Sequence, residues 1–239
     1  MSNSIATLDR VVSLSEQGFG DSFETVDGFD SVGAEASATW YEMQKRAIDI
    51  VAASIAVVLL SPLFLVVALL IKLTSRGPVL FVQTRVGRGG REFRCFKFRS
   101  MVANAEALQR QLAAMNHHAD ERTFKIRRDP RITRIGEVLR KTSIDEMPQL
   151  FNVLRGDMSL VGPRPPLPRE VAKYEPYEFR RLAVQPGLTC FWQVSGRGDI
   201  PFPRQVEMDI SYIEQRSLLL DLKLLLLTIP AVVLGKGAY

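Results

Sequence analysis

The 239-residue sequence is short of the residue types that build disulfide frameworks and metal centres. It has two cysteines, Cys95 and Cys190, without the spacing of metal ligands, and only two histidines. Two cysteines give no disulfide framework, which suits a reducing compartment. The N-terminal segment also lacks a basic start followed by an apolar core, so we expect no signal peptide.

Basic residues are scarce at the N-terminus and abundant in the middle of the chain. Residues 1–44 carry eight acids and one base, and they are rich in Ser and Gly. We therefore predict that residues 1–39 form an acidic, disordered tail. Residues 45–141 carry nineteen bases and seven acids. This positive segment suits nucleic acid, anionic lipid or a phosphorylated substrate as a partner.

A long apolar run begins after Lys45 and Arg46. The 22 residues from Ile50 to Ile71 contain no charge, which corresponds to roughly 33 Å of helix, about one hydrocarbon thickness. A spanning helix is the simplest interpretation. However, Ser61-Pro62 lies at the centre of the run, where Pro bends a helix and the Ser hydroxyl can satisfy a freed backbone group.

The charges beside this run favour a different topology. Basic residues stand on both sides, at Lys45, Arg46, Lys72, Arg76, Arg85 and Arg88. The positive-inside rule then places both ends in the cytoplasm, which a re-entrant helix–break–helix over residues 40–76 satisfies. From physical reasoning alone, the re-entrant and spanning forms are equally favoured. Either form favours lipid or a phosphorylated substrate over nucleic acid.

A β-hairpin is predicted after the apolar run. Apolar and polar residues alternate from Phe93 to Phe98, which is typical of a strand, and residues 87–90 form its Gly-rich turn. Alternation places Lys97 on the same face as Cys95. A single Lys near the end of a strand is usually solvated.

The chemistry of the chain is concentrated between Thr142 and Pro166. Ser143 and Glu146 have the spacing of a capping box, so we predict that a helix starts there, and Gly156 is its expected stop. Asp145 and Glu146 would then lie at a helix N-terminus, where the dipole favours ionised carboxylates.

Two interpretations of this acid pair remain open. Acidic residues are common in first turns simply because they stabilise helices. The pair also has Arg140 before it, and Asp157 and Arg164 after it, with Arg164 held between two prolines. A rigid Arg suits phosphate recognition, and ionised carboxylates can bind Mg²⁺ or attack phosphorus.

The strings Ser143–Gln149, Gly156–Pro165 and Phe96–Met101 resemble signatures of the bacterial sugar transferases, which are small monotopic phosphoglycosyl transferases. The resemblance extends from about Trp40 to Tyr239 and favours the re-entrant form. It implies transfer of a sugar-1-phosphate, with galactose or glucose as the leading sugars, from a UDP-sugar to undecaprenyl phosphate. UMP is released, at the cytoplasmic face of the bacterial inner membrane, in exopolysaccharide synthesis. A homodimer is a further possibility.

The resemblance also implies roles for individual residues. Asp145 would be the nucleophile that forms an aspartyl-phosphosugar, and it would hold Mg²⁺ together with Glu146. Phosphate-binding residues would be Lys97, Arg140, Arg164 and Arg197, and Asp157 would orient one of the arginines.

We therefore predict a mainly helical α+β fold with a re-entrant membrane helix hairpin, a short β-hairpin and interfacial amphipathic helices. Residues 77–216 would form a cytosolic catalytic domain. Residues 217–239 would form an interfacial helix, because Asp221, Lys223 and Pro230 interrupt its apolar sequence. Two other functions are a membrane-bound phosphoryl-transfer enzyme such as a lipid phosphatase, and a non-catalytic membrane scaffold.

Overall fold

A computed structural model describes residues 30–102, 104, 105, 107, 108, 126, 129–196 and 200–234, with side chains from residue 40 to residue 232. The described elements, with η for 3₁₀ helices, are α2 (Asp30–Thr74), β1 (Leu80–Val86), η1 (Arg88–Gly90), β2 (Glu92–Phe98), α4 (Arg134–Lys141), η3 (Ile144–Glu146), α5 (Gln149–Arg155), β3 (Ser159–Val161), α6 (Pro168–Val171), η4 (Pro176–Leu182), β4 (Gly187–Thr189), α7 (Phe191–Ser195), α8 (Phe202–Gln215) and α9 (Leu218–Leu234). This agrees with a mainly helical α+β fold. Of the predicted tail, residues 1–29 lie outside the described residues, and the backbone of residues 30–39 belongs to α2.

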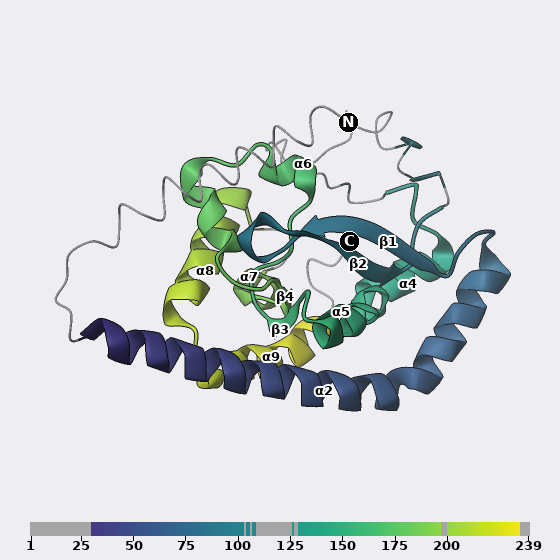
Figure 1. Ribbon diagram of the computed structural model, residues 1–239. Helices are drawn as coiled ribbons and strands as arrows, with labels where there is room; N and C mark the ends of the chain where they lie inside the picture. The colour runs from purple at the N-terminus through teal and green to yellow at the C-terminus, as the bar shows by residue number, and fades with distance from the viewer. Residues whose placement is uncertain are drawn as a thin grey trace.

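Helix α2 is the one described helix that is long and apolar enough to cross a membrane. It bends along its course (Figure 1), and Pro62 lies inside it. The Ser61 hydroxyl donates to the Val58 carbonyl over 2.8 Å, as expected where Pro disturbs the backbone bonds. The sequence predicted a hairpin of two helices. The structure has one continuous, bent helix instead, because the Ser-Pro pair is accommodated without leaving helical geometry.

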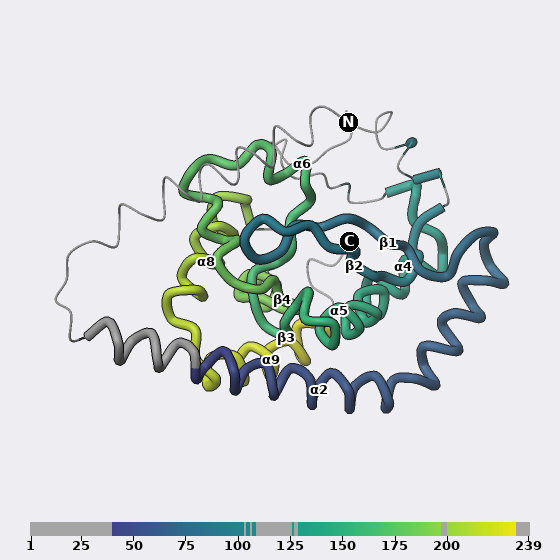
Figure 2. Tube along the Cα trace, viewed as in Figure 1, coloured from purple at the N-terminus to yellow at the C-terminus, as the bar shows by residue number. Residues whose placement is uncertain are grey.

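The other labelled helices and strands lie on the inner side of this bend (Figures 1 and 2). From the first arm of α2, Ala53 is fully buried in the main core. From the second arm, Val67 and Ile71 are buried against Phe98 and Leu139. Both arms of α2 therefore pack against the same domain.

The outer surface of α2 is apolar and exposed. Large side chains there are more than half exposed: Ile55 55%, Val58 70%, Leu59 72%, Leu65 74% and Leu69 59%. A continuous apolar surface of this kind marks an interaction with a membrane or with another protein.

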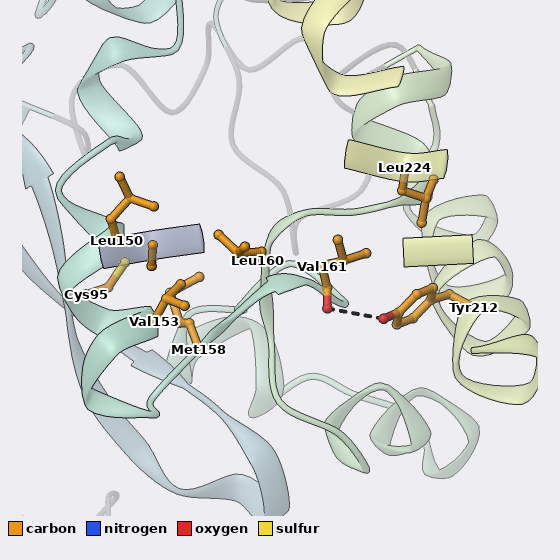
Figure 3. Close-up of a cluster of buried hydrophobic side chains, with 9 residues drawn as sticks. Cys95, Leu150, Val153, Met158, Leu160, Val161, Tyr212 and Leu224 are labelled. Carbon is orange, nitrogen blue, oxygen red and sulfur yellow. Dashed lines mark hydrogen bonds between the residues drawn. The ribbon is translucent and has the colours of Figure 1, made fainter. Parts of the chain in front are cut away.

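The main core joins elements that are distant in the sequence. Side chains from α5, β3, α8 and α9 meet there (Figure 3), with Leu150, Val153, Leu160, Tyr212 and Leu224 among them. The Tyr212 hydroxyl lies inside this core and donates to the Val161 carbonyl over 3.1 Å. Burial of its polar group is thus compensated by a hydrogen bond.

Strands β1 and β2 form the predicted antiparallel hairpin, with Leu80 opposite Phe98 and Val86 opposite Glu92. The connecting turn contains Gly89 and Gly90, both at positive φ (64° and 79°), a conformation that glycine adopts without steric cost. The predicted strand and turn are confirmed.

A second sheet, which the sequence did not predict, pairs β3 with β4 in parallel. The two backbones approach so closely that a Cβ atom at Gly187 would overlap the backbone of Gly162. Because Arg164 follows β3 after two residues, this sheet positions the Pro-Arg-Pro segment.

Asp221 joins helix α2 to the C-terminal part of the fold. Its buried carboxylate accepts hydrogen bonds from Tyr41 (2.9 Å), Lys45 (2.7 Å) and Tyr212 (2.7 Å). In the sequence, Asp221 interrupts the apolar run of α9. In the structure, its charge is paired with Lys45 inside the protein. Whether α9 lies in a membrane interface stays a prediction.

We expect Asp221→Ala to lower the free energy of unfolding by about 3 kcal/mol, because it leaves the largely buried Lys45 ammonium and the Tyr41 hydroxyl without their acceptor, while Tyr212 keeps only its longer bond to the Val161 carbonyl. Chemical denaturation in detergent micelles measures the loss. Glu207→Ala is the control, since the Arg204–Glu207 pair is solvent-exposed and its removal should change stability by less than about 1 kcal/mol. Equal effects of the two substitutions would contradict the expectation.

Candidate active site

The acid pair lies in the 3₁₀ turn η3, between α4 and α5. Ser143 precedes the turn in a left-handed conformation, with φ of 56°, and its side chain makes no capping bond. The predicted capping box is therefore wrong, because Ser143 is left-handed where an N-cap residue is typically extended. The predicted stop is correct: Gly156 ends α5 at a φ of 88°.

Glu146 is held by two cations from distant segments. Its Oε1 atom lies 2.6 Å from Lys97 Nζ and 3.3 Å from Arg164 Nη1. Lys97 belongs to β2, and its side chain is only 16% exposed. The interpretation of Lys97 as a solvated residue was therefore wrong. The alternation of the strand was correct, but only the packing of η3 against β2 shows what Lys97 faces.

The position of Arg164 is fixed by strand β1. The Val86 amide donates to the Pro166 carbonyl over 2.9 Å, and Arg85 donates to the Pro165 carbonyl over 2.8 Å. Together with the fixed φ of the flanking prolines, these bonds hold the segment that carries Arg164.

Asp145 and Glu146 differ in their electrostatic environments. Burial, together with the neighbouring Glu146 carboxylate, raises the pKa of Asp145 to about 6. Burial acts in the same direction on Glu146, but Lys97 and Arg164 outweigh it and hold the pKa of Glu146 far below its usual value. Glu146 is therefore a permanent anion, whereas Asp145 is ionised at neutral pH and accepts a proton in mild acid.

The acid pair opens onto a cavity of about 680 Å³. Of the residues predicted from the sequence, it brings together Asp145, Glu146, Lys97, Arg140 and Arg164. Arg140 has no carboxylate partner within the described part of the chain, so its charge is available to a ligand. The excess of cations over acids on these walls suits an anionic ligand with several phosphate oxygens.

Sequence reasoning missed further cations on the cavity wall. Three of them, Arg85, Arg99 and Arg131, are buried there. In the sequence, Arg85 was counted only among the charges beside the apolar run. The hairpin register gives a signal for Arg85: it pairs with Phe93, as Gln83 pairs with Cys95, on the face that carries Lys97. This signal depends on the register of the two strands, and therefore on the exact number of residues in the turn, which the sequence alone did not determine.

Of the predicted site residues that the structure describes, Asp157 is the one that does not line this cavity. The Asp157 carboxylate accepts a bond from Asn152 over 3.1 Å and lies 3.4 Å from Arg155 Nε. It therefore does not orient any of the predicted phosphate-binding arginines that the structure describes. Arg197 lies outside the described residues, so its predicted role stays a prediction.

Comparison with known proteins decides which kind of protein carries this site. The sequence model of the family described as "Bacterial sugar transferase" matches residues 40–235. The chain belongs to this family. The predicted family is thus confirmed.

Three related proteins bear on the activity of the transferase. The exopolysaccharide production protein ExoY of Rhizobium meliloti is 42% identical over 200 residues, which cover 82% of this chain and 88% of that protein. The undecaprenyl-phosphate galactose phosphotransferase of Salmonella typhimurium is 43% identical over 82% of this chain and 41% of its own length. The undecaprenyl-phosphate glucose phosphotransferase of Komagataeibacter xylinus is 44% identical over 84% of this chain and 38% of its own length.

The transferase is therefore an enzyme of the phosphoglycosyl transferase class, as predicted. The alternative of a non-catalytic scaffold, in which the acid pair only caps a helix, is set aside on these matches. The local structure agrees in one respect, because the first turn of the following α-helix, α5, contains no acid.

We expect Asp145→Asn to stabilise the protein at neutral pH. Because the pKa of Asp145 is raised to about 6 in the folded state, ionisation of this group lowers stability as the pH rises above the unfolded value of about 4. The gain from Asn should be complete above a pH of about 6 and should disappear as the pH falls toward 4. Thermal unfolding between pH 4 and pH 8, without divalent cations, measures it.

Glu146→Gln provides the opposite sign at the adjacent position. It removes the anion that pairs with Lys97 and Arg164, so stability at neutral pH should fall. A gain from both substitutions, or a gain from Asp145→Asn that does not vary with pH, would show that the two environments are wrongly assigned.

Proposed function

We propose that this transferase moves a sugar-1-phosphate from a UDP-sugar to undecaprenyl phosphate and releases UMP, as the first membrane step of exopolysaccharide synthesis. The proposal rests on the environment of Asp145. Its carboxylate is ionised at neutral pH and lines a cation-rich cavity, next to a Glu146 whose negative charge is paired with Lys97. The names of the related proteins support undecaprenyl phosphate as acceptor, and galactose or glucose as the sugar.

We further propose that α2 enters and leaves the membrane by the same face, the cytoplasmic face of the inner membrane. Because both arms of α2 pack against one domain, both ends of the helix lie on the side of that domain (Figure 1). The exposed apolar side chains lie away from it. This arrangement supports a helix that dips into the bilayer and places the cavity near the boundary between lipid and water.

In the first step, an Asp145 carboxylate oxygen attacks the β-phosphorus of the UDP-sugar. A new bond forms between this oxygen and phosphorus. The bond from the β-phosphorus to the bridging oxygen breaks, and UMP leaves with the electron pair. The raised pKa suits this role, because a more basic carboxylate is a stronger nucleophile while it remains ionised near pH 7.

The cations of the site act on the phosphate charges. Lys97 and Arg164 lie beside the acid pair, and Arg140 lines the same cavity with its charge unpaired by the described residues. Ammonium and guanidinium donors placed there bind the diphosphate and stabilise the charge that develops on UMP. Glu146 positions Lys97 and Arg164 for this purpose.

We propose Mg²⁺ as the cofactor. The described residues contain no group of three or more candidate metal ligands. However, one or two carboxylates together with substrate phosphates are a common Mg²⁺ site in phosphoryl-transfer enzymes. Asp145 and Glu146 fit such a shared site. When bound, the ion would offset the charge of the diphosphate.

In the second step, an oxygen of the lipid phosphate attacks the phosphorus of the aspartyl-phosphosugar. The bond from Asp145 to phosphorus breaks, and the carboxylate is regenerated as the lipid diphosphate sugar forms. Because Asp145 takes part in both steps, the proposal requires ping-pong kinetics.

We expect Asp145→Asn to abolish transfer, with a loss of about four orders of magnitude or more, because an amide is a poor nucleophile. The assay incubates membranes that contain the enzyme with a panel of UDP-sugars and undecaprenyl phosphate, and it scores UMP. Glu207→Gln, an exposed substitution on α8, is the control. A fully active Asp145→Asn enzyme would refute the nucleophile, and release of inorganic phosphate without UMP would favour a lipid phosphatase.

Separate substitutions of Lys97 and Arg164 by Ala should each lower kcat/KM for the UDP-sugar by about 10-fold to 100-fold, because each removes a charged hydrogen-bond donor. Initial rates at several donor concentrations measure the effect. Arg204→Ala, which removes an exposed guanidinium of similar charge, should leave the value unchanged. Equal losses in all three variants would indicate an effect of net charge alone.

A further inference from the structure

One end of the cavity that contains Asp145 is apolar and takes no part in the steps above. Its walls come from β3, β4, α7 and the second half of α9, and they include Leu160, Leu188, Val194, Leu225, Ala231 and Val232. The acid pair and its cations line the same cavity. A single space therefore leads from charged walls to hydrocarbon walls.

The two threonines at this end add little polarity. The hydroxyls of Thr189 and Thr228 lie 2.7 Å apart and pair with each other, and Thr228 also donates to the Leu224 carbonyl over 2.7 Å. Hydroxyls that are satisfied within the protein leave methyl groups as the surface that a ligand meets. The surface between β4 and α9 is thus apolar, and α7 adds the Gln193 amide as a polar group on the neighbouring wall.

Helix α9 is apolar on both of its faces. Leu225, Thr228 and Val232 follow one another at helical spacing and line the cavity. On the other face, Leu222 and Leu226 are 53% and 59% exposed. From Leu224 onward α9 carries no charged residue, and a helix that is apolar all round has apolar surroundings on each side. One wall of α9 therefore faces the reacting centre, and the other faces outward from the protein.

We propose that the inner face of α9 binds the isoprenoid chain of the acceptor while the lipid phosphate lies at the charged end, beside Asp145. This inference rests on the proposed function and identifies where its second substrate lies. A nucleoside or a sugar fits the apolar walls poorly, because its hydroxyls and amides would lose hydrogen bonds to water without replacement. A hydrocarbon chain loses none, and its burial is favourable.

Adjacent leucines on α9 provide a matched pair of variants. Leu225→Asn changes the cavity wall, and Leu226→Asn changes the outer face. We expect Leu225→Asn to lower kcat/KM for undecaprenyl phosphate by about tenfold or more, through a higher KM, because it removes apolar contact with the chain. The burst of UMP formed without acceptor should be unchanged in both variants, and Leu226→Asn should retain the acceptor KM.

Ala231→Leu is a second test. It keeps the wall apolar, and Leu, like Ala, is a good helix former. Its larger side chain should narrow the cavity and raise the KM for undecaprenyl phosphate. A prenyl phosphate with a single isoprene unit should react equally well with this variant and with the parent enzyme, because its chain is too short to need the wall. Equal loss with both acceptors would overturn the inference.

Photocrosslinking separates this inference from the proposed function. An undecaprenyl phosphate analogue with a photoreactive group in its chain should label the inner face of α9 in the full-length protein, and Ala231→Leu should reduce the labelling. If the parent enzyme released no UMP, the proposed function would fail while this labelling could still be scored. Labelling confined to α2 or to the outer face of α9, or equal acceptor KM values for the two Asn variants, would overturn the inference.

Discussion

The site depends on the ion pairs of Glu146 with Lys97 and Arg164. These three charges come from a 3₁₀ turn, a strand of the β-hairpin and the segment after β3, so their pairing joins three parts of the fold at one point. All three side chains are partly exposed, Arg164 by one third, so removing one partner costs less than the roughly 3–5 kcal/mol of a fully buried pair. The same pairs allow Glu146 to lie next to the buried carboxyl of Asp145.

Unequal compensation of the two acids produces their different chemistry. Lys97 and Arg164 both pair with Glu146, which stays ionised. Burial away from water and the negative charge of Glu146 raise the pKa of Asp145. The local field therefore keeps Glu146 ionised and makes Asp145 the more basic of the two carboxylates. This division of roles between neighbouring acids is a common result of placing titratable groups in different environments.

The long apolar helix α2 is bonded directly to the elements that carry the site. Arg46 of α2 donates to the carbonyls of Val153 and Leu154 at the end of α5, the helix that follows the acid pair. A cation at a helix C-terminus is favoured by the helix dipole. A second bond joins α2 to α9, from the Lys45 ammonium to the Asp221 carboxylate. The position of α2 and the position of the acid pair are therefore fixed by the same packing.

Short-range signals in the sequence were sufficient for several features. The Ser61-Pro62 bend, the alternating strand of the hairpin and the stop at Gly156 each follow from the geometry of a few neighbouring residues. Family signatures in the sequence also identified the acid pair. Tertiary structure alone decided that Lys97 binds Glu146, that Arg85 lines the cavity and that Asp157 does not. The physical reason is that burial and charge pairing depend on partners from distant segments, whose approach is set by the packing of the whole domain against α2.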